Sequence, residues 1–322
     1  MGYDEFSMFA DNAQEAGLAY DQPPVVSREF VAVDQSGRRL SALIWGTADP
    51  EVVLLHGGGQ NAHTWDTVLL ALGRPAVAVD LPGHGHSDGS APGAESVRGD
   101  ATDVAAVMRV LCPRAQIVVG MSLGGMTAIA LSDIAPELVP ALVLVDILPE
   151  PNPAATRLIT QFLDGPETFG SFDEILARTI QFNPTRSVSS LRRGILHNAE
   201  QLPDGRWRWR HRRQASPSRR SVDPAELASY LWDSLARLSA PLLLIRGMAA
   251  GSVVTDAQVA RLREVAPDAQ VEPVPGAGHS VQGDKPVVLA RVIGTFAEHG
   301  LPRWRAANGR FQHPPGSRRI RS

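Results

Sequence analysis

The sequence contains a single cysteine, Cys112, so no disulfide bond can form within the chain. This scarcity fits a reducing compartment. No stretch approaches the roughly 18 consecutive apolar residues that a membrane-spanning helix needs. The first residues, MGYDEFSMFADNAQEAG, are acidic and contain no long apolar run, so they do not form a secretory signal peptide. We therefore expect a soluble, cytoplasmic protein with no membrane partner.

A strong charge of one sign is also missing. The formal net charge is −3 at pH 7, so the overall field does not predict a polyanionic partner. One arginine-rich segment, RWRWRHRRQASPSRR at 206–220, could form a nucleic-acid patch. However, the chain uses arginine almost everywhere and has one lysine, Lys285, and the alternation RWRWR fits a short amphipathic strand. We expect no nucleic-acid partner.

Apolar, β-branched runs recur along the chain and alternate with helical patterns. A hairpin formed by REFVAV and LSALIWG comes first. The later runs span 51–57, 75–83, 115–122, 141–147, 241–247 and 269–276, with helical stretches at 96–111, 255–266 and 284–300. Continuous apolar runs are typical of parallel strands that are buried on both faces. The pattern predicts an α/β fold with a doubly wound, mostly parallel sheet.

One long segment, 148–235, interrupts this alternation and contains no comparable strand pattern. A loop of that length needs structure of its own, and we expect a mainly helical lid inserted after the sixth strand. The core then comprises 25–147 and 236–300. Residues 1–24 are expected to form a flexible N-terminal segment, and the basic tail 301–322 to be disordered.

The segment GMSLGG, residues 120–125, follows a buried strand and precedes a helical stretch. Its G-x-S-x-G pattern in this context predicts a nucleophile elbow with Ser122 on a very sharp turn. Gly120 and Gly124 would remove side chains that collide there. The helix N-terminus would place backbone N–H groups near developing negative charge, and Leu123 N–H is the first expected oxyanion donor.

A second oxyanion donor is expected in the loop LLHGGGQNAHTW, which follows the third strand. Its glycines allow close approach of the backbone to a substrate, and Gly58 is the preferred donor, with Gly59 next. His56 precedes the turn and is expected to pack beneath the loop. The general base is expected to be His279, in the glycine-rich loop GAGH between a strand and the last helix.

Taken in order, HGGGQ, VDLPGHGHSDG, GMSLGG and GAGHS resemble the α/β-hydrolase superfamily. The resemblance covers roughly 28–147 and 236–300, and it is specific for the superfamily but not for a substrate. It implies an α/β-hydrolase fold with a lid after the sixth strand. The serine nucleophile argues against haloalkane dehalogenases and epoxide hydrolases, in which this position is aspartate.

The acidic member of the expected triad departs from the common pattern. In most of the superfamily it follows the seventh strand, but here LLLIRGMAAGSVVTD has no carboxylate from Gly247 through Thr255, and Ser252 stands about where the acid should be. Asp256 comes late and suits the start of a helix. The alternative is Asp146, which ends the sixth strand. We expect its carboxylate within about 3.2 Å of a His279 ring nitrogen.

These features predict a serine hydrolase that forms an acyl-enzyme with the triad Ser122, His279 and Asp146, and with Gly58 and Leu123 as the oxyanion hole. The substrate would be a small-molecule ester, lactone, thioester or activated C–C bond. The alternative is a ligand-binding or receptor-type homologue with slow turnover or none. We expect no cofactor and no metal, because the sequence shows no metal-ligand cluster or phosphate loop. The sequence leaves the oligomeric state open.

Overall fold

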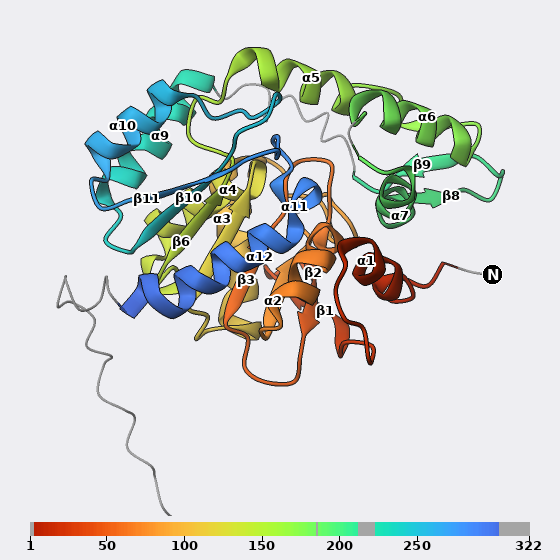
Figure 1. The fold of residues 1–322 in the computed structure, drawn as a ribbon, viewed down its shortest axis with the longest axis horizontal. Helices are drawn as coiled ribbons and strands as arrows, with labels where there is room; N and C mark the ends of the chain where they lie inside the picture. Colours follow the sequence, from red (N-terminus) through yellow and green to blue (C-terminus); the bar gives the residue numbers. More distant parts are fainter. Residues whose placement is uncertain (1–2, 185, 212–222, 303–322) are drawn as a thin grey trace, which may run out of the picture.

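The computed structural model describes residues 3–184, 186–211 and 223–302. Its centre is a sheet of eight strands in the order β1-β2-β4-β3-β5-β6-β10-β11 (Figure 1). Strands β1 and β2 form the expected antiparallel hairpin, β2 pairs antiparallel with β4, and the remaining pairs are parallel. The predicted doubly wound, mostly parallel sheet is therefore present. Its strands are β1 (Val26–Ala32), β2 (Arg39–Trp45), β3 (Val52–Leu55), β4 (Ala76–Val79), β5 (Ile117–Met121), β6 (Leu142–Val145), β10 (Leu242–Gly247) and β11 (Gln270–Val274).

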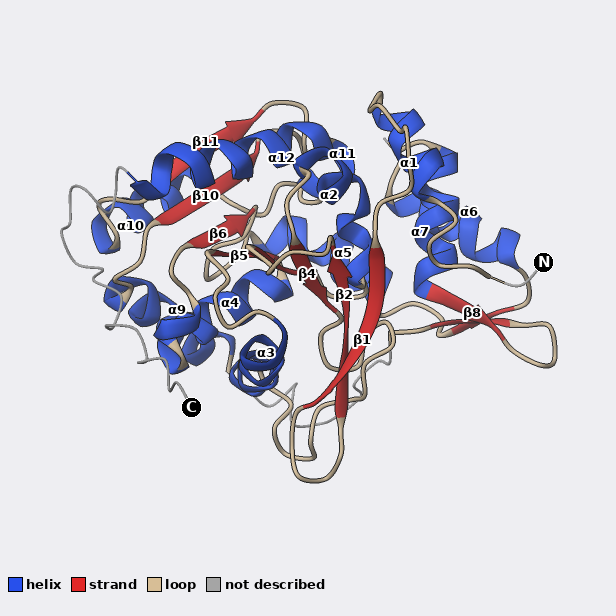
Figure 2. Ribbon diagram, turned by 90° about the horizontal axis from the view of Figure 1, so that it is seen from below, coloured by secondary structure: helices blue, strands red, loops and turns tan. Residues whose placement is uncertain are grey.

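The central strands β3, β4, β5 and β6 are buried on both faces, which explains why they read as continuous apolar runs. Alternate residues of the strands belong to two separate apolar clusters. Helices α3 (Val97–Leu111), α4 (Leu123–Ile134), α9 (Pro224–Arg237) and α10 (Asp256–Val265) contribute to the cluster on one face. Helices α1 (Phe9–Ala16), α2 (Asp66–Leu72) and α12 (Pro286–Thr295) contribute to the cluster on the other face, and Figure 2 shows this arrangement. Short helical segments η1 (Ala62–Trp65), η2 (Pro136–Leu138), α11 (Val281–Asp284) and η3 (Phe296–Gly300) complete the core.

The segment between β6 and α9 has its own small core. It contains α5 (Pro153–Leu163), β7 (Thr168–Phe169), α6 (Phe172–Phe182), α7 (Val188–Asn198), β8 (Ala199–Gln201) and β9 (Trp207–Trp209). The three short strands form a second sheet in the order β7-β9-β8. Residues of α6, α7 and these strands form a third apolar cluster, which includes Ile175 and Trp209. Helices α5 and α6 run across the top of the molecule in Figure 1.

The arginine-rich segment enters this second sheet. The alternating residues of β9 form the strand that the sequence predicted, and Arg208 and Arg210 both pair with Glu200. These arginines therefore have partners within the protein. The rest of the segment, 212–220, lies outside the described residues.

Helix α9 packs with the core, whereas the sequence prediction placed it in the lid. Leu231, Trp232 and Leu235 belong to the large cluster beside α4, and Tyr230 and Arg237 both bond to Asp133 at the end of α4. The helical pattern gives the buried face of α9 but not the surface against which that face packs.

The N-terminal segment also differs from the expected flexible chain. From Tyr3 onward it is ordered, and Phe9 of α1 is 1% exposed, with its ring 4.9 Å from that of Trp45. Glu5 pairs with Arg28 of β1 at 2.5 Å. The buried ring and the ion pair hold the segment against the core. The expected tail, 301–322, lies outside the described residues except for its first two positions, 301 and 302.

A buried polar cluster connects this segment to the core and to α7. The His63 ring bonds through Nδ1 to Asp66 at 2.9 Å and through Nε2 to Glu5 at 3.0 Å, and it stacks on the ring of His197 at 3.9 Å. Arg28 also approaches Nε2 of His63, at 3.3 Å. Burial opposes the charge of His63, but Asp66 and Glu5 outweigh burial and raise the pKa of His63 to about 9.

The raised pKa of His63 predicts a loss of stability in mild alkali. Because the folded pKa lies above the unfolded value, about 6.5, this contribution is fully present below about pH 6.5 and disappears as pH rises through about 9. The shift corresponds to roughly 3 kcal/mol. The urea midpoint, measured between pH 6 and pH 9.5, should therefore fall more steeply in the wild type than in His63→Gln. Parallel slopes for the two proteins would show that His63 does not titrate in this way.

No helix in the described ranges, with their gaps at 185 and 212–222, is long and apolar enough to cross a membrane.

Candidate active site

Ser122 lies at the turn from β5 into α4, with φ 52° and ψ −117°. Residues other than glycine rarely adopt this backbone conformation, and backbone strain of this kind is concentrated at functional sites. A Cβ atom on Gly120 would lie 2.4 Å from the carbonyl oxygen of Gly124, and one on Gly124 would lie 2.3 Å from that of Leu55. The sharp turn therefore requires glycine at both positions, as the sequence predicted.

Helix α4 begins with Leu123, directly after the serine. The N–H of the next residue, Gly124, donates to the carbonyl of His56 at 3.0 Å, and Met126 N–H donates to Ser122 at 3.0 Å. The positive end of the helix dipole is thus directed at the serine turn. This geometry favours Leu123 N–H as a donor toward a group bound at Ser122.

The glycine loop after β3 passes directly beside the serine. A Cβ atom on Gly57 would lie 3.3 Å from Cβ of Ser122 and 2.6 Å from Sδ of Met121. Glycine is therefore needed for this close approach. It brings the backbone of the loop to the side of the serine turn, where a second oxyanion donor is expected.

The amides on either side of Gly58 already have partners. Gly57 N–H donates to Oε1 of Gln60 at 3.1 Å, and Gly59 N–H donates to Nε2 of His84 at 3.1 Å. Gly58 is thus favoured over Gly59 as the donor. These hydrogen bonds to Gln60 and His84 hold the loop in place.

His56 is fully buried beneath the loop, as the sequence predicted. Its Nδ1 bonds to the carbonyl of Gly57 at 2.7 Å, and its Nε2 accepts the N–H of Leu81 at 2.9 Å. Burial lowers the pKa of His56. Because both ring nitrogens are engaged in backbone hydrogen bonds, this histidine supports the loop.

Asp146 follows β6 at the same edge of the sheet as Ser122. The two strands are parallel neighbours in which Met121 pairs with Val145, so that Ser122 and Asp146 are the next residues of each strand. Asp146 is completely buried and has φ 46°, which is also an unusual conformation for a residue with a side chain. The register alone therefore brings these two residues to adjacent strand ends.

The buried carboxylate of Asp146 accepts hydrogen bonds from two loops. One oxygen accepts from Gly247 N–H at 2.9 Å and from Ser252 Oγ at 2.6 Å. The other accepts from Val253 N–H at 3.0 Å and bonds to Nδ1 of His279 at 3.1 Å. The expected contact of Asp146 with His279 is therefore present. Ser252 stands at the position where the acid usually lies, and its hydroxyl donates to Asp146, the carboxylate at the end of β6. The sequence analysis did not predict this hydrogen bond.

Asp256 is at the start of α10 and not in this cluster. Thr255 caps the helix with Gln258 in a reciprocal capping box. The side chain of Asp256 is 94% exposed and pairs with Arg246. This confirms the expectation that Asp256 serves the helix start, where a carboxylate interacts favourably with the helix dipole.

The structure thus joins His279 to Asp146 and places Ser122 at the neighbouring strand end. Within the described part of the chain, no hydrogen bond links His279 to Ser122. Such catalytic hydrogen bonds are often long without substrate and tighten when substrate binds. The arrangement is suited to proton transfer between serine and imidazole, with the imidazole oriented by a buried carboxylate.

One group in the described ranges has ligand atoms close enough to hold a metal ion. His63, Asp66 and His197 present such atoms within 4.8 Å of one another. However, the two imidazole rings are stacked with only 13° between their planes, so their in-plane lone pairs do not converge on one point. The guanidinium of Arg28 also lies against His63. We therefore interpret the cluster as an ion-pair network.

The sequence matches the model of the alpha/beta hydrolase family over residues 52–292, and the chain belongs to this family. Esterase Rv0045c of Mycobacterium tuberculosis is 44% identical over 299 residues, which cover 91% of this chain and 95% of the relative. A crystal structure of that esterase has a TM-score of 0.77 and covers 92% of this chain and 99% of its own.

A second relative, the 2-(acetamidomethylene)succinate hydrolase of Mesorhizobium japonicum, is 26% identical over 252 residues, which cover 77% of this chain and 88% of the relative. The protein is accordingly an enzyme, an α/β-fold hydrolase with a small-molecule substrate.

Proposed function

We propose that this hydrolase is a serine esterase that works through an acyl-enzyme. The observation that carries the proposal is the 3.1 Å contact between His279 and the buried Asp146, at the strand end beside the strained Ser122. Among the bonds that the sequence leaves open, the 44% identity to a named esterase favours a carboxylic ester.

The first half of the reaction forms the acyl-enzyme. Ser122 Oγ attacks the carbonyl carbon, and its proton passes to Nε2 of His279, the ring nitrogen that Asp146 leaves free. The N–H groups of Gly58 and Leu123 stabilise the oxyanion that forms. The tetrahedral intermediate then collapses, the bond to the alcohol breaks, and His279 returns the proton to the departing alkoxide.

The second half releases the acid. A water molecule gives a proton to His279 and attacks the acyl carbon, and collapse of the second intermediate frees the carboxylic acid and restores the Ser122 hydroxyl. The buried carboxylate of Asp146 holds the ring in the tautomer that both halves require, and stabilises the imidazolium.

An apolar cavity of about 310 Å³ adjoins the first residue after the serine and is a candidate for the acyl group. It lies between the starts of α3, α4 and α9, and its lining includes Val97, Leu123, Leu227 and Tyr230. We propose that the insertion, predicted as the lid 148–235, selects the substrate by shaping the space over the strand ends, because open α/β sheets bind ligands there.

Turnover of p-nitrophenyl butyrate is the direct test. An esterase should release many equivalents of p-nitrophenol per protein, and a fluorophosphonate should abolish turnover and be found by mass spectrometry on Ser122. A receptor-type protein would instead show thermal stabilisation by ligand with at most slow release. An adduct on another residue would refute the mechanism.

A further inference from the structure

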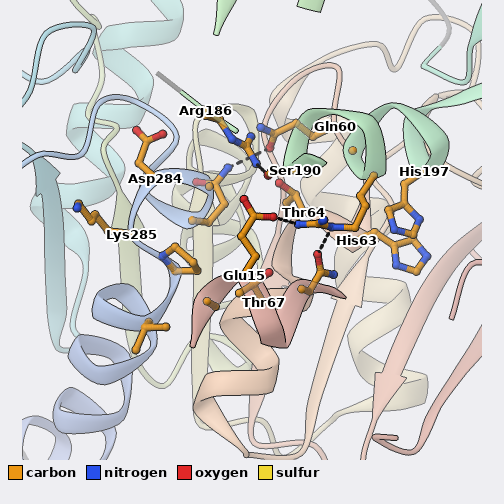
Figure 3. Close-up of a pocket in the computed structure, with 18 of the residues that line it drawn as sticks. Glu15, Gln60, His63, Thr64, Thr67, Arg186, Ser190, His197, Asp284 and Lys285 are labelled. Carbon is orange, nitrogen blue, oxygen red and sulfur yellow. Dashed lines mark hydrogen bonds and ion pairs between the residues drawn. The ribbon is translucent and has the colours of Figure 1, made fainter. Parts of the chain in front are cut away.

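A second cavity, of about 410 Å³, lies between α1, η1, α7 and α11 (Figure 3). Its volume is in the range of small-molecule sites. Gln60 and Gln282 form part of its wall. Gln60 Oε1 accepts the N–H of Gly57 in the oxyanion loop and lies 3.4 Å from Nε2 of Gln282. The cavity is therefore separated from the proposed oxyanion loop by a single layer of side chains.

Arg186 brings a positive charge into this cavity without a matching carboxylate. In Figure 3 its guanidinium lies beside Ser190, to whose Oγ it donates at 2.7 Å. Among the described residues it forms no ion pair, and its buried Nε has no hydrogen-bond partner. The guanidinium also lies against the backbone of Gly283, where a Cβ atom would come within 2.8 Å of Nη1. A partly buried charge of this kind is costly unless something pairs with it.

The acidic residues of the cavity are already engaged elsewhere. Glu15 accepts hydrogen bonds from Ser189 at 2.9 Å and from Ser187 and Arg193. Asp284 accepts the N–H of Gly278 at 2.9 Å. Burial lowers the pKa of Arg186 although Asp284 and Glu15 act to raise it. These two carboxylates thus leave the charge of Arg186 incompletely compensated.

The balance of charges indicates a singly charged anion. Arg186, Arg193 and Lys285 face Glu15 and Asp284, which is three positive charges against two negative ones. The charge of His63, which also lies on the wall, is matched by Asp66 and Glu5. The positive end of α7, which begins two residues after Arg186, adds to the field in the same place. A second, smaller cavity of about 260 Å³ shares Arg186 and Lys285 with the first. A dianion would face repulsion from both carboxylates.

We propose that this cavity binds the carboxylate of a small organic acid through the guanidinium of Arg186. Guanidinium suits this role because its planar fork matches a carboxylate and its charge strengthens the hydrogen bonds. The acid is either the free end of a half-ester substrate or a separate molecule bound beside the oxyanion loop. The assignment to a half-ester substrate rests on the proposed esterase function, whereas the carboxylate-binding site itself does not.

The binding test is independent of catalysis. Monomethyl glutarate and dimethyl glutarate are titrated calorimetrically into Ser122→Ala, which leaves the cavity intact. The half-ester should bind at least tenfold more tightly than the uncharged diester, because a hydrogen bond to a charged group is worth about 1.5–3 kcal/mol. Adding Arg186→Gln should remove this preference, and adding Arg186→Lys should retain part of it.

Arg192→Gln is the matched control, because Arg192 is exposed on α7, the helix that follows Arg186, and lies over the ring of Phe172 at 4.8 Å. It should leave binding unchanged. Equal binding of the two glutarates to the Ser122→Ala protein, or equal losses in the Arg186 and Arg192 variants, would overturn the proposal. Because the first comparison needs no change at Arg186, it holds even if those variants fold poorly.

Kinetics distinguish the two sources of the acid. For a substrate carboxylate, Arg186→Gln should raise KM for p-nitrophenyl hemiglutarate at least tenfold and leave p-nitrophenyl butyrate unaffected. For a separate acid, pentanoate, which carries a single carboxylate, should change hydrolysis of p-nitrophenyl butyrate in the wild type and not in Arg186→Gln. Either pattern supports the site. If the half-ester bound selectively but no ester were hydrolysed, the esterase proposal would be refuted and the carboxylate-binding site would stand.

Discussion

Replacing Ser122 with alanine should abolish ester hydrolysis while the protein stays folded. In the proposed mechanism the serine hydroxyl is the only atom that becomes acylated, so its removal should lower kcat by about 10⁴-fold or more. Alanine has the same Cβ as serine and brings no new clash into the turn, where φ is 52°. The measurement is kcat/KM for p-nitrophenyl butyrate, with circular dichroism to verify the fold.

Ser132→Ala provides a matched control on the same helix. The hydroxyl of Ser132 donates to the carbonyl of Ile129 at 2.7 Å, about three helical turns away from the proposed chemistry. Its loss should reduce stability slightly, by about 1 kcal/mol, and leave kcat near the wild-type value. If Ser122→Ala hydrolysed esters as fast as Ser132→Ala, the serine mechanism would be wrong.

The core of the fold and most of the candidate site could be predicted because they depend on local signals. The turn at Ser122 requires glycines within two residues of it, and buried parallel strands require continuous apolar runs. Asp146 could be identified because a carboxylate that ends such a strand needs a partner. The alternation of strands and helices predicts a parallel sheet, and the strand order in that sheet brings Asp146 and His279 to a contact of 3.1 Å.

The features that the sequence did not predict depend on packing between distant segments. Helix α1 is ordered because Phe9 meets Trp45, and α9 joins the core because its apolar face meets α4. The hydrogen bond from Ser252 to Asp146 joins residues far apart in the chain. A pattern within one segment shows which face is apolar, but the partner of that face is set by the tertiary structure.

Asp146→Asn should nearly silence the enzyme without unfolding it, and Asp256→Asn should not. The asparagine amide would present an N–H group where the carboxylate now accepts, which favours the wrong tautomer of His279 and typically lowers kcat by about 10⁴-fold. Asp256 lies at the exposed start of α10, where the loss of one surface ion pair costs at most about 1 kcal/mol.

The two variants distinguish Asp146, at the end of β6, from Asp256, later in the chain, as the acidic member of the triad. Both remove one negative charge, so a general effect of net charge would lower kcat/KM equally in each. Gly247 N–H and Val253 N–H donate to different oxygens of Asp146, and asparagine keeps only one oxygen, so one of these two hydrogen bonds is lost. A partial loss of stability is therefore expected for Asp146→Asn, and urea unfolding measures it separately. If Asp146→Asn retained wild-type kcat/KM, the assignment would fail; if Asp256→Asn were the inactive variant, the assignment would reverse.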